Sequence, residues 1–170
     1  SANRPTYQAL REKTAKGQKP IAAILTCADS RVPPETIFNQ QIGDLFVCRV
    51  AGNVSSEENV GSIEYAIEHL GVGLIVIMGH TECGAVKAAL SKQKIEGALG
   101  KLIAEVQVGD VPNDKTALSV AIRNNVDAAV TRLRKSSPNL NEMARQGRIR
   151  IVGAVYSLES GQVEWLPAKK

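Results

Sequence analysis

Two short apolar segments end in residues that commonly bind metal ions. The first, residues 21–26, is aliphatic and runs into Cys27. The second, residues 74–78, continues through Gly79 into His80 and Cys83, in a His-x-x-Cys spacing. Apolar runs without polar alternation are typical of parallel strands that are covered on both faces of a sheet. Any fold of this chain must therefore bury two strands that carry three soft ligands at their ends.

The remaining apolar patterns alternate between helix and strand. Further strands are expected at residues 44–50 and 150–156, and the second of these is followed by a hairpin strand at 162–166. Helices are expected at residues 6–17, 34–40, 57–70, 83–90, 95–106, 114–135 and 139–146. This alternation predicts an α/β fold with a mostly parallel central sheet, strand order 2-1-3-4 and an antiparallel edge strand, flanked by helices. We expect residues 1–170 to form a single domain.

In sheets of this kind, ligands bind beyond the carboxyl ends of the strands, where the strand order reverses. If the first and third strands are neighbours, that point lies between Cys27 and His80. Thiolate and imidazole are zinc ligands, and three protein ligands with one open position are typical of catalytic zinc. Cys83 is expected at a helix N-terminus, which favours its thiolate form. The sequence therefore predicts a Zn²⁺ site, with Gly79 allowing a tight turn before His80.

A carboxylate and a guanidinium follow the first ligand closely. Asp29 lies two positions after Cys27, and Arg31 lies two positions after Asp29. A bidentate pair would keep Asp29 ionised and off the metal, free to accept a hydrogen bond from the nucleophile. Taken singly, each feature has a plainer interpretation, because buried cysteines pack as small apolar groups and acid–arginine pairs are often structural. Cys48 is expected in the core, and His69 is the alternative ligand.

Composition narrows the classes of partner and compartment. The chain has 170 residues and a net charge of +4, but its basic residues are scattered, so we expect no nucleic-acid partner. No apolar run is long enough to span a membrane, so we expect no membrane association. Three cysteines do not suggest a disulfide framework, which favours a reducing compartment and a cytoplasmic location.

The segments Cys27-Ala-Asp29-Ser-Arg31 and His80-Thr-Glu-Cys83-Gly84 resemble the paired motifs of the β-class carbonic anhydrases. The similarity continues through residues 32–35, 43–47, 49–53 and 61–66. The resemblance implies Zn²⁺ on the two cysteines and the histidine, with Asp29 and Arg31 as a catalytic dyad. It also implies the reversible hydration of carbon dioxide to bicarbonate and a proton, by attack of zinc-bound hydroxide.

The resemblance also implies a substrate pocket and an oligomer. The positions that match the family's substrate-binding residues are Gln18, Phe46, Ala51, Tyr65 and Gly84. In this family the site lies at a dimer interface, so a homodimer or a tetramer built from dimers (homotetramer) is expected. Relatives that are regulated by bicarbonate carry a tryptophan where this chain has Ile24, so no such regulation is expected, although Arg49 matches the arginine of that regulatory site.

Two other functions are also consistent with this sequence. The same scaffold hosts hydrolases of carbonyl sulfide and carbon disulfide, and a fold does not settle the substrate. A zinc-binding module without catalytic activity is the alternative from another class, and it would be expected to show a fourth protein ligand.

Overall fold

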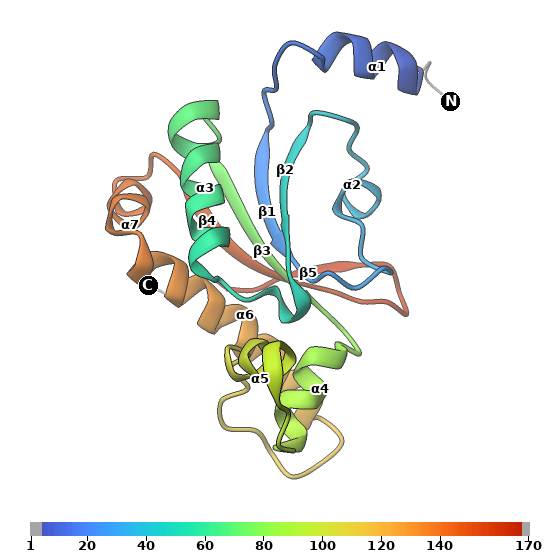
Figure 1. The fold of residues 1–170 in the computed structure, drawn as a ribbon, viewed down its shortest axis with the longest axis vertical. Coiled ribbons are helices and arrows are strands. Elements are labelled where there is room, and N and C mark those ends of the chain that lie inside the picture. The colour runs from blue at the N-terminus through green and yellow to red at the C-terminus, as the bar shows by residue number, and fades with distance from the viewer. Residues whose placement is uncertain (1–4, 168–170) are drawn as a thin grey trace.

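A five-stranded sheet forms the centre of the molecule, which the computed structural model describes for residues 5–167 (Figure 1). The strand order is β2-β1-β3-β4-β5. The strands are β1 (Ala22–Thr26), β2 (Leu45–Arg49), β3 (Leu74–His80), β4 (Arg150–Tyr156) and β5 (Val163–Trp165). All neighbours pair in parallel except β4 and β5, which are antiparallel. The predicted α/β class, strand order and antiparallel edge are thus confirmed.

Seven α-helices and one short 3₁₀ helix accompany the sheet in the described residues. They are α1 (Tyr7–Thr14), α2 (Pro34–Ile37), η1 (Ala51–Asn53), α3 (Glu57–Leu70), α4 (Gly84–Ser91), α5 (Gly97–Ala104), α6 (Ala117–Ser136) and α7 (Pro138–Arg145). Several boundaries follow local chemistry. Pro34 is the first residue of α2, where a missing N–H is tolerated, and α3 ends at Gly71 in the left-handed conformation.

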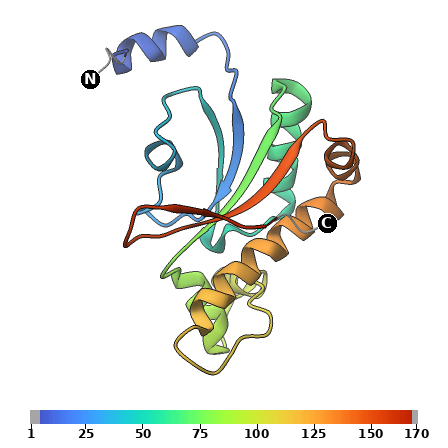
Figure 2. The same cartoon turned by 180° about the vertical axis from the view of Figure 1, so that it is seen from behind.

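Alternate residues of the strands face two separate cores. On one face Ala23, Leu25, Ile75 and Ile77 pack with apolar residues of α3 and α6, including the fully buried Ile63 and Leu133. On the other face Ile24, Val76 and Met78 pack with Ile37 of α2 and with the β4–β5 hairpin. Seen from behind, β3 and β4 pass in front of α3, and the hairpin reaches across toward α2 (Figure 2). Both faces of β1 and β3 are therefore covered, as their unbroken apolar sequences predicted.

The turn predicted at Gly79 is wrong. β3 continues to His80, and Gly79 pairs with Val155 inside the sheet. A Cβ atom at Gly79 would lie 2.8 Å from a methyl carbon of Val126 on α6. The residue is small because a helix crosses closely above the strand. This packing keeps His80 in regular strand geometry, at the edge where Cys27 emerges.

Two further features concern the helices. Helix α1 extends away from the sheet and buries none of its residues (Figure 1). Among the described residues, no helix combines the length and apolar character that crossing a membrane requires.

Candidate metal centre

Three predicted ligands meet at the carboxyl edge of β1 and β3. Cys27 directly follows β1, His80 is the last residue of β3, and Cys83 is the N-cap of α4. Their sulfur and ring nitrogen atoms all lie within 4.8 Å of one another, and all three residues are buried. Thr26, which donates from Oγ1 to the carbonyl of Met78 at 2.9 Å, ties the two strands together just before the ligands. The structure therefore brings together the ligand set that the sequence predicted.

The orientation of His80 leaves one ring nitrogen aimed at the cysteines. Its Nδ1 lies 2.8 Å from the carbonyl oxygen of Thr81, which fixes Nδ1 as the donor. Its Nε2 is buried and has no hydrogen-bond partner in the described residues. Buried polar atoms are nearly always paired, and a metal-binding histidine commonly donates its other N–H to a carbonyl. The unpaired Nε2 and the two adjacent sulfur atoms together fit a zinc ion.

The two cysteines and His80 are electrostatically coupled. A hydrogen bond from Cys83 lowers the pKa of Cys27 to about 4, against the opposing effect of burial, and His80 and the N–H of Gly52 act in the same direction. The same contact with Cys27, together with burial, raises the pKa of Cys83. Burial opposes protonation of His80, but the nearby sulfur of Cys27 and its thiolate charge outweigh burial and raise the pKa of His80. The pocket already stabilises one thiolate, which is the form that binds metal.

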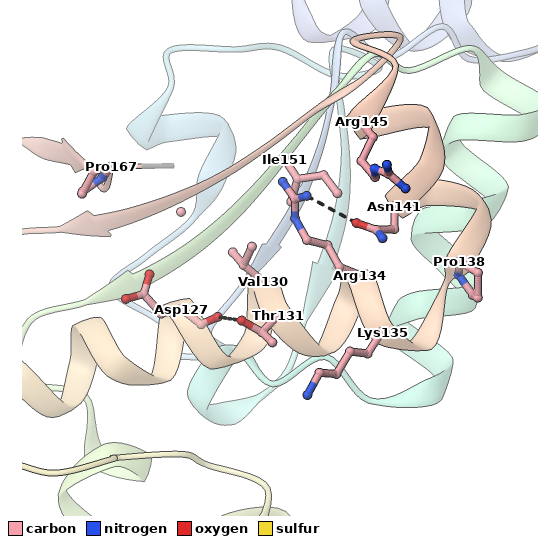
Figure 3. Close-up of a pocket in the computed structure, with 11 residues that line it drawn as sticks. Asp127, Val130, Thr131, Arg134, Lys135, Pro138, Asn141, Arg145, Ile151 and Pro167 are labelled. Carbon is pink, nitrogen blue, oxygen red and sulfur yellow. Dashed lines mark hydrogen bonds between the residues drawn. The ribbon is translucent and has the colours of Figure 1, made fainter. Parts of the chain in front are cut away.

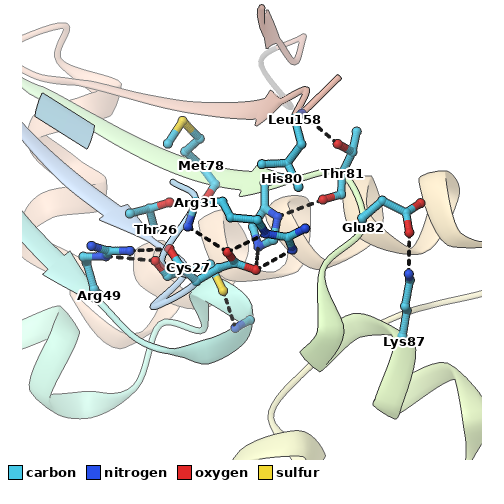
Figure 4. Close-up of polar contacts among 12 residues, drawn as sticks. Thr26, Cys27, Arg31, Arg49, Met78, His80, Thr81, Glu82, Lys87 and Leu158 are labelled. Carbon is cyan, nitrogen blue, oxygen red and sulfur yellow. Dashed lines mark hydrogen bonds and ion pairs between the residues drawn. The ribbon is translucent and has the colours of Figure 1, made fainter. Parts of the chain in front are cut away.

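Asp29 and Arg31 form the predicted bidentate pair. Arg31 lies beside Cys27 and His80 (Figure 4). Arg31 donates from Nε to Oδ1 at 2.9 Å and from Nη2 to Oδ2 at 2.7 Å, and its backbone N–H also donates to Oδ1 at 2.9 Å. These bonds hold the pKa of Asp29 well below its usual range. The Oδ2 atom of Asp29 lies 3.8 Å from Nε2 of His80. An ionised carboxylate is thus fixed next to the ligand cluster.

Arg49, at the end of β2, supports the loop that carries these groups. It donates from Nε to the carbonyl of Cys27 at 3.0 Å and from Nη2 to the carbonyl of Asp29 at 2.5 Å. Nothing in the sequence indicates this role directly, because Arg49 matches only an arginine of the regulatory site of some relatives. The parallel pairing of Arg49 with Thr26 explains it, since both residues end their strands at the same edge.

The predicted substrate residues are placed unevenly around the ligands. Ala51 begins η1 and Gly84 begins α4, so both are close in the chain to elements of the metal centre. Gln18 is exposed in the segment before β1. Phe46 pairs with Ala23 near the start of β1, and its ring centroid is 6.2 Å from that of Tyr65 on α3. The structure therefore places Gln18, Phe46 and Tyr65 away from the C-terminal ends of β1 and β3, where the metal ligands of the same chain lie.

Two other sequence expectations concern residues outside the ligand set. Cys48 is buried in β2, as predicted. His69 lies on α3, where its ring centroid is 5.1 Å from that of Tyr65, and it does not belong to the ligand cluster. His80 thus supplies the imidazole of the cluster.

A cavity of about 600 Å³ lies between α6, α7 and β4, away from the Cys–His–Cys cluster (Figure 3). Its lining combines cationic side chains, such as Arg134, Lys135 and Arg145, with apolar side chains such as Val130 and Ile151. None of the predicted site residues is among the described residues that line it. Its size alone does not make it the functional site, because the convergent ligands lie elsewhere.

The fold and the ligand cluster together define a class of protein: an α/β protein with a Cys–His–Cys metal centre at the carboxyl edge of a parallel sheet. A family model described as carbonic anhydrase matches residues 22–163. The chain is 39% identical over 155 residues to "Carbonic anhydrase 2" of Mycobacterium tuberculosis, covering 87% of this chain and 75% of that protein.

Solved structures agree with this match. The β-carbonic anhydrase of Coccomyxa, solved in complex with acetazolamide, superimposes with a TM-score of 0.84 at 30% identity, covering 94% of this chain and 77% of that one. A tetrameric β-carbonic anhydrase of Sordaria macrospora gives a TM-score of 0.82 at 28% identity, covering 92% and 85%. The chain belongs to the β-class carbonic anhydrase family of enzymes, as its motifs predicted.

Proposed function

We propose that this protein catalyses the reversible hydration of carbon dioxide to bicarbonate and a proton, with Zn²⁺ held by Cys27, His80 and Cys83. The observation that carries the proposal is the buried Cys–His–Cys cluster, in which Nε2 of His80 has no hydrogen-bond partner among residues 5–167 and the Asp29–Arg31 pair lies alongside. Bound zinc would supply Lewis-acid chemistry, which acidifies a water molecule and makes it a nucleophile at neutral pH.

Asp29 is proposed to orient that nucleophile. Its carboxylate stays ionised because Arg31 donates to both of its oxygens. Each carboxylate oxygen has two acceptor sites, so Oδ2 can accept a hydrogen bond from the reacting water while it still accepts one from Arg31. When Asp29 accepts this hydrogen bond, the water is held with a lone pair directed toward carbon dioxide. Arg31 also prevents Asp29 from rotating toward the metal, because rotation would break two charge-assisted hydrogen bonds.

The substrate pocket is proposed to need a second copy of the chain. The family resemblance assigns substrate binding to Gln18, Phe46, Ala51, Tyr65 and Gly84. Of these, Gln18, Phe46 and Tyr65 lie away from the metal centre of their own chain. Tyr65 is 48% exposed, so its ring is available to a neighbouring subunit.

Helix α1 supports the same conclusion. It has 8 residues and buries none of them. An isolated helix that short is only marginally stable in water, so packing against another chain would stabilise it. We therefore propose a homo-oligomer built from dimers.

The three free cysteines suit a reducing compartment, and we propose that the protein is located in the cytoplasm.

Stopped-flow measurement of carbon dioxide hydration by the zinc-loaded protein, across a range of pH, tests the proposal. Fast hydration that rises with pH is expected, because deprotonation of the nucleophilic water produces the reactive form. Two buried cysteines provide a matched comparison. Cys27→Ala should lose zinc and activity, whereas Cys48→Ala should keep both, because Cys48 lies outside the cluster.

No hydration at any pH from protein that holds zinc would refute the proposed reaction. Turnover of carbonyl sulfide or carbon disulfide by the same sample would then identify a hydrolase. Inactivity on all three gases, with a fourth protein ligand on the metal, would identify a structural zinc module instead.

A further inference from the structure

Asn125 is a polar residue in the core beneath the metal centre. It lies in the middle of α6 and is only 2% exposed. Its Nδ2 donates to the carbonyl of Gly52 at 2.7 Å, and its Oδ1 accepts from the N–H of Gln107 at 3.0 Å. Burying an amide is costly unless both of its ends are paired, and here both are. The side chain therefore links α6 to η1 and to the loop that follows α5.

Gly52 connects this side chain to a metal ligand. Its N–H donates to Sγ of Cys27 at 3.4 Å, while its carbonyl accepts from Asn125. Gly52 adopts a positive φ of 76°, and a Cβ atom there would lie 2.8 Å from a side-chain carbon of Val106 and 3.2 Å from one of Ala85. The N–H reaches the sulfur only while the glycine keeps this orientation.

We propose that Asn125 is a positioning residue for the metal centre, holding Gly52 so that its N–H points at the sulfur of Cys27. A hydrogen bond to a thiolate stabilises the charged form and orients its remaining lone pairs toward a metal. The inference rests on the zinc site proposed above. It extends the site to a residue far from Cys27 in the sequence, through a chain of two hydrogen bonds.

The neighbouring residue offers a matched control. Asn124 donates from Nδ2 to the carbonyl of Val108 at 2.8 Å and to that of Asp110 at 3.2 Å. Asn124 and Asn125 thus hold the same loop, but only Asn125 has a hydrogen bond to Gly52. If Asn125 served merely to hold that loop, removing either amide would affect the metal centre similarly.

The test compares zinc release from Asn125→Ala and Asn124→Ala into a chelating dye. Losing the hydrogen-bond partner that supports a metal ligand commonly costs 10–100-fold in metal affinity, so we expect about 10-fold or faster release from Asn125→Ala. Asn124→Ala should release zinc at the wild-type rate. Cobalt-substituted samples supply a spectroscopic test: the sulfur-to-cobalt charge-transfer band should shift in Asn125→Ala alone. Equal release from both variants, or an unshifted band, would overturn the proposal.

Two additions keep the test decisive. If Asn125→Ala does not fold, as judged by circular dichroism, Asn125→Ser replaces it, because serine retains a polar group at the buried position. Amide hydrogen exchange of Gly52 is then measured in metal-free protein, where faster exchange in the Asn125 variant supports the link and unchanged exchange contradicts it. Wild-type protein that fails to bind zinc would refute the proposed function, and the exchange measurement would still decide whether Asn125 holds Gly52.

Discussion

Thr81 provides a measurable connection between the metal centre and the β4–β5 hairpin. Its carbonyl accepts from Nδ1 of His80 at 2.8 Å, and its N–H donates to the carbonyl of Tyr156 at 2.9 Å. Its hydroxyl accepts from the N–H of Leu158 at 2.9 Å. The substitution Thr81→Val keeps the shape of the side chain but removes this acceptor. The Leu158 N–H would then have to find water or remain unpaired.

The expected cost follows from the burial of this bond. A buried donor left unpaired costs about 1–3 kcal/mol, and because this hydrogen bond is only partly buried, we expect about 1–2 kcal/mol. In a domain of this size each kcal/mol lowers Tm by about 2–4 °C, so the fall in Tm should be about 2–8 °C. The hairpin would also hold the Thr81 carbonyl less firmly, so the affinity for zinc should fall as well.

Thermal unfolding of metal-free Thr81→Val and Thr81→Ser, followed by circular dichroism, separates the hydroxyl from the methyl group. Serine keeps the acceptor, so Thr81→Ser should melt close to the wild type. Zinc affinity of both variants, measured by competition with a chelator, should follow the same order. A Val variant as stable as the wild type, or a Ser variant destabilised as much as the Val variant, would refute this account of the hairpin contact.

Three further substitutions or treatments test other parts of the structure. Arg31→Ala should lower the rate of carbon dioxide hydration by about 10²-fold, because Asp29 loses its orientation, while metal analysis still finds zinc; a folded but zinc-free variant would contradict this. Burial raises the pKa of the Cys48 thiol above its ordinary 9.0. The stability that the buried, protonated thiol contributes is therefore present below pH 9.0, and it is lost as the pH rises through the pKa of Cys48 in the folded protein. Mass spectrometry should accordingly find Cys48 alkylated more slowly in native than in denatured protein at mildly alkaline pH, and equal rates would count against it. Gly79→Ala should lower the free energy of unfolding by about 1–3 kcal/mol in urea titrations, because the added methyl group would press on α6; an unchanged midpoint would show that the helix can move away.

The central sheet and the ligand cluster could be predicted because their signals are local. Each ligand stands at the end of an apolar run, and parallel strands place such ends at one edge. The pair of Asp29 and Arg31 could be predicted for the same reason, since both lie in one short loop. The role of Gly79 could not be predicted, because a small residue is needed there only to make room for α6, which is distant in sequence. A glycine before a ligand suggests a turn unless the crossing helix is known.

The contacts that support the metal centre could not be predicted from the sequence, for a different physical reason. Arg49, Thr81 and Asn125 act on backbone groups, which every residue possesses, so no complementary residue type marks their partners. Asn124 and Asn125 make the point most sharply. In a helical pattern two adjacent asparagines both look like polar surface residues, yet one lies at the edge of a loop while the other is buried beneath Cys27. Only the rotation of α6 against the sheet decides which of them faces the core. That rotation is set by the apolar residues of the helix as a group, so the identity of either asparagine cannot reveal it.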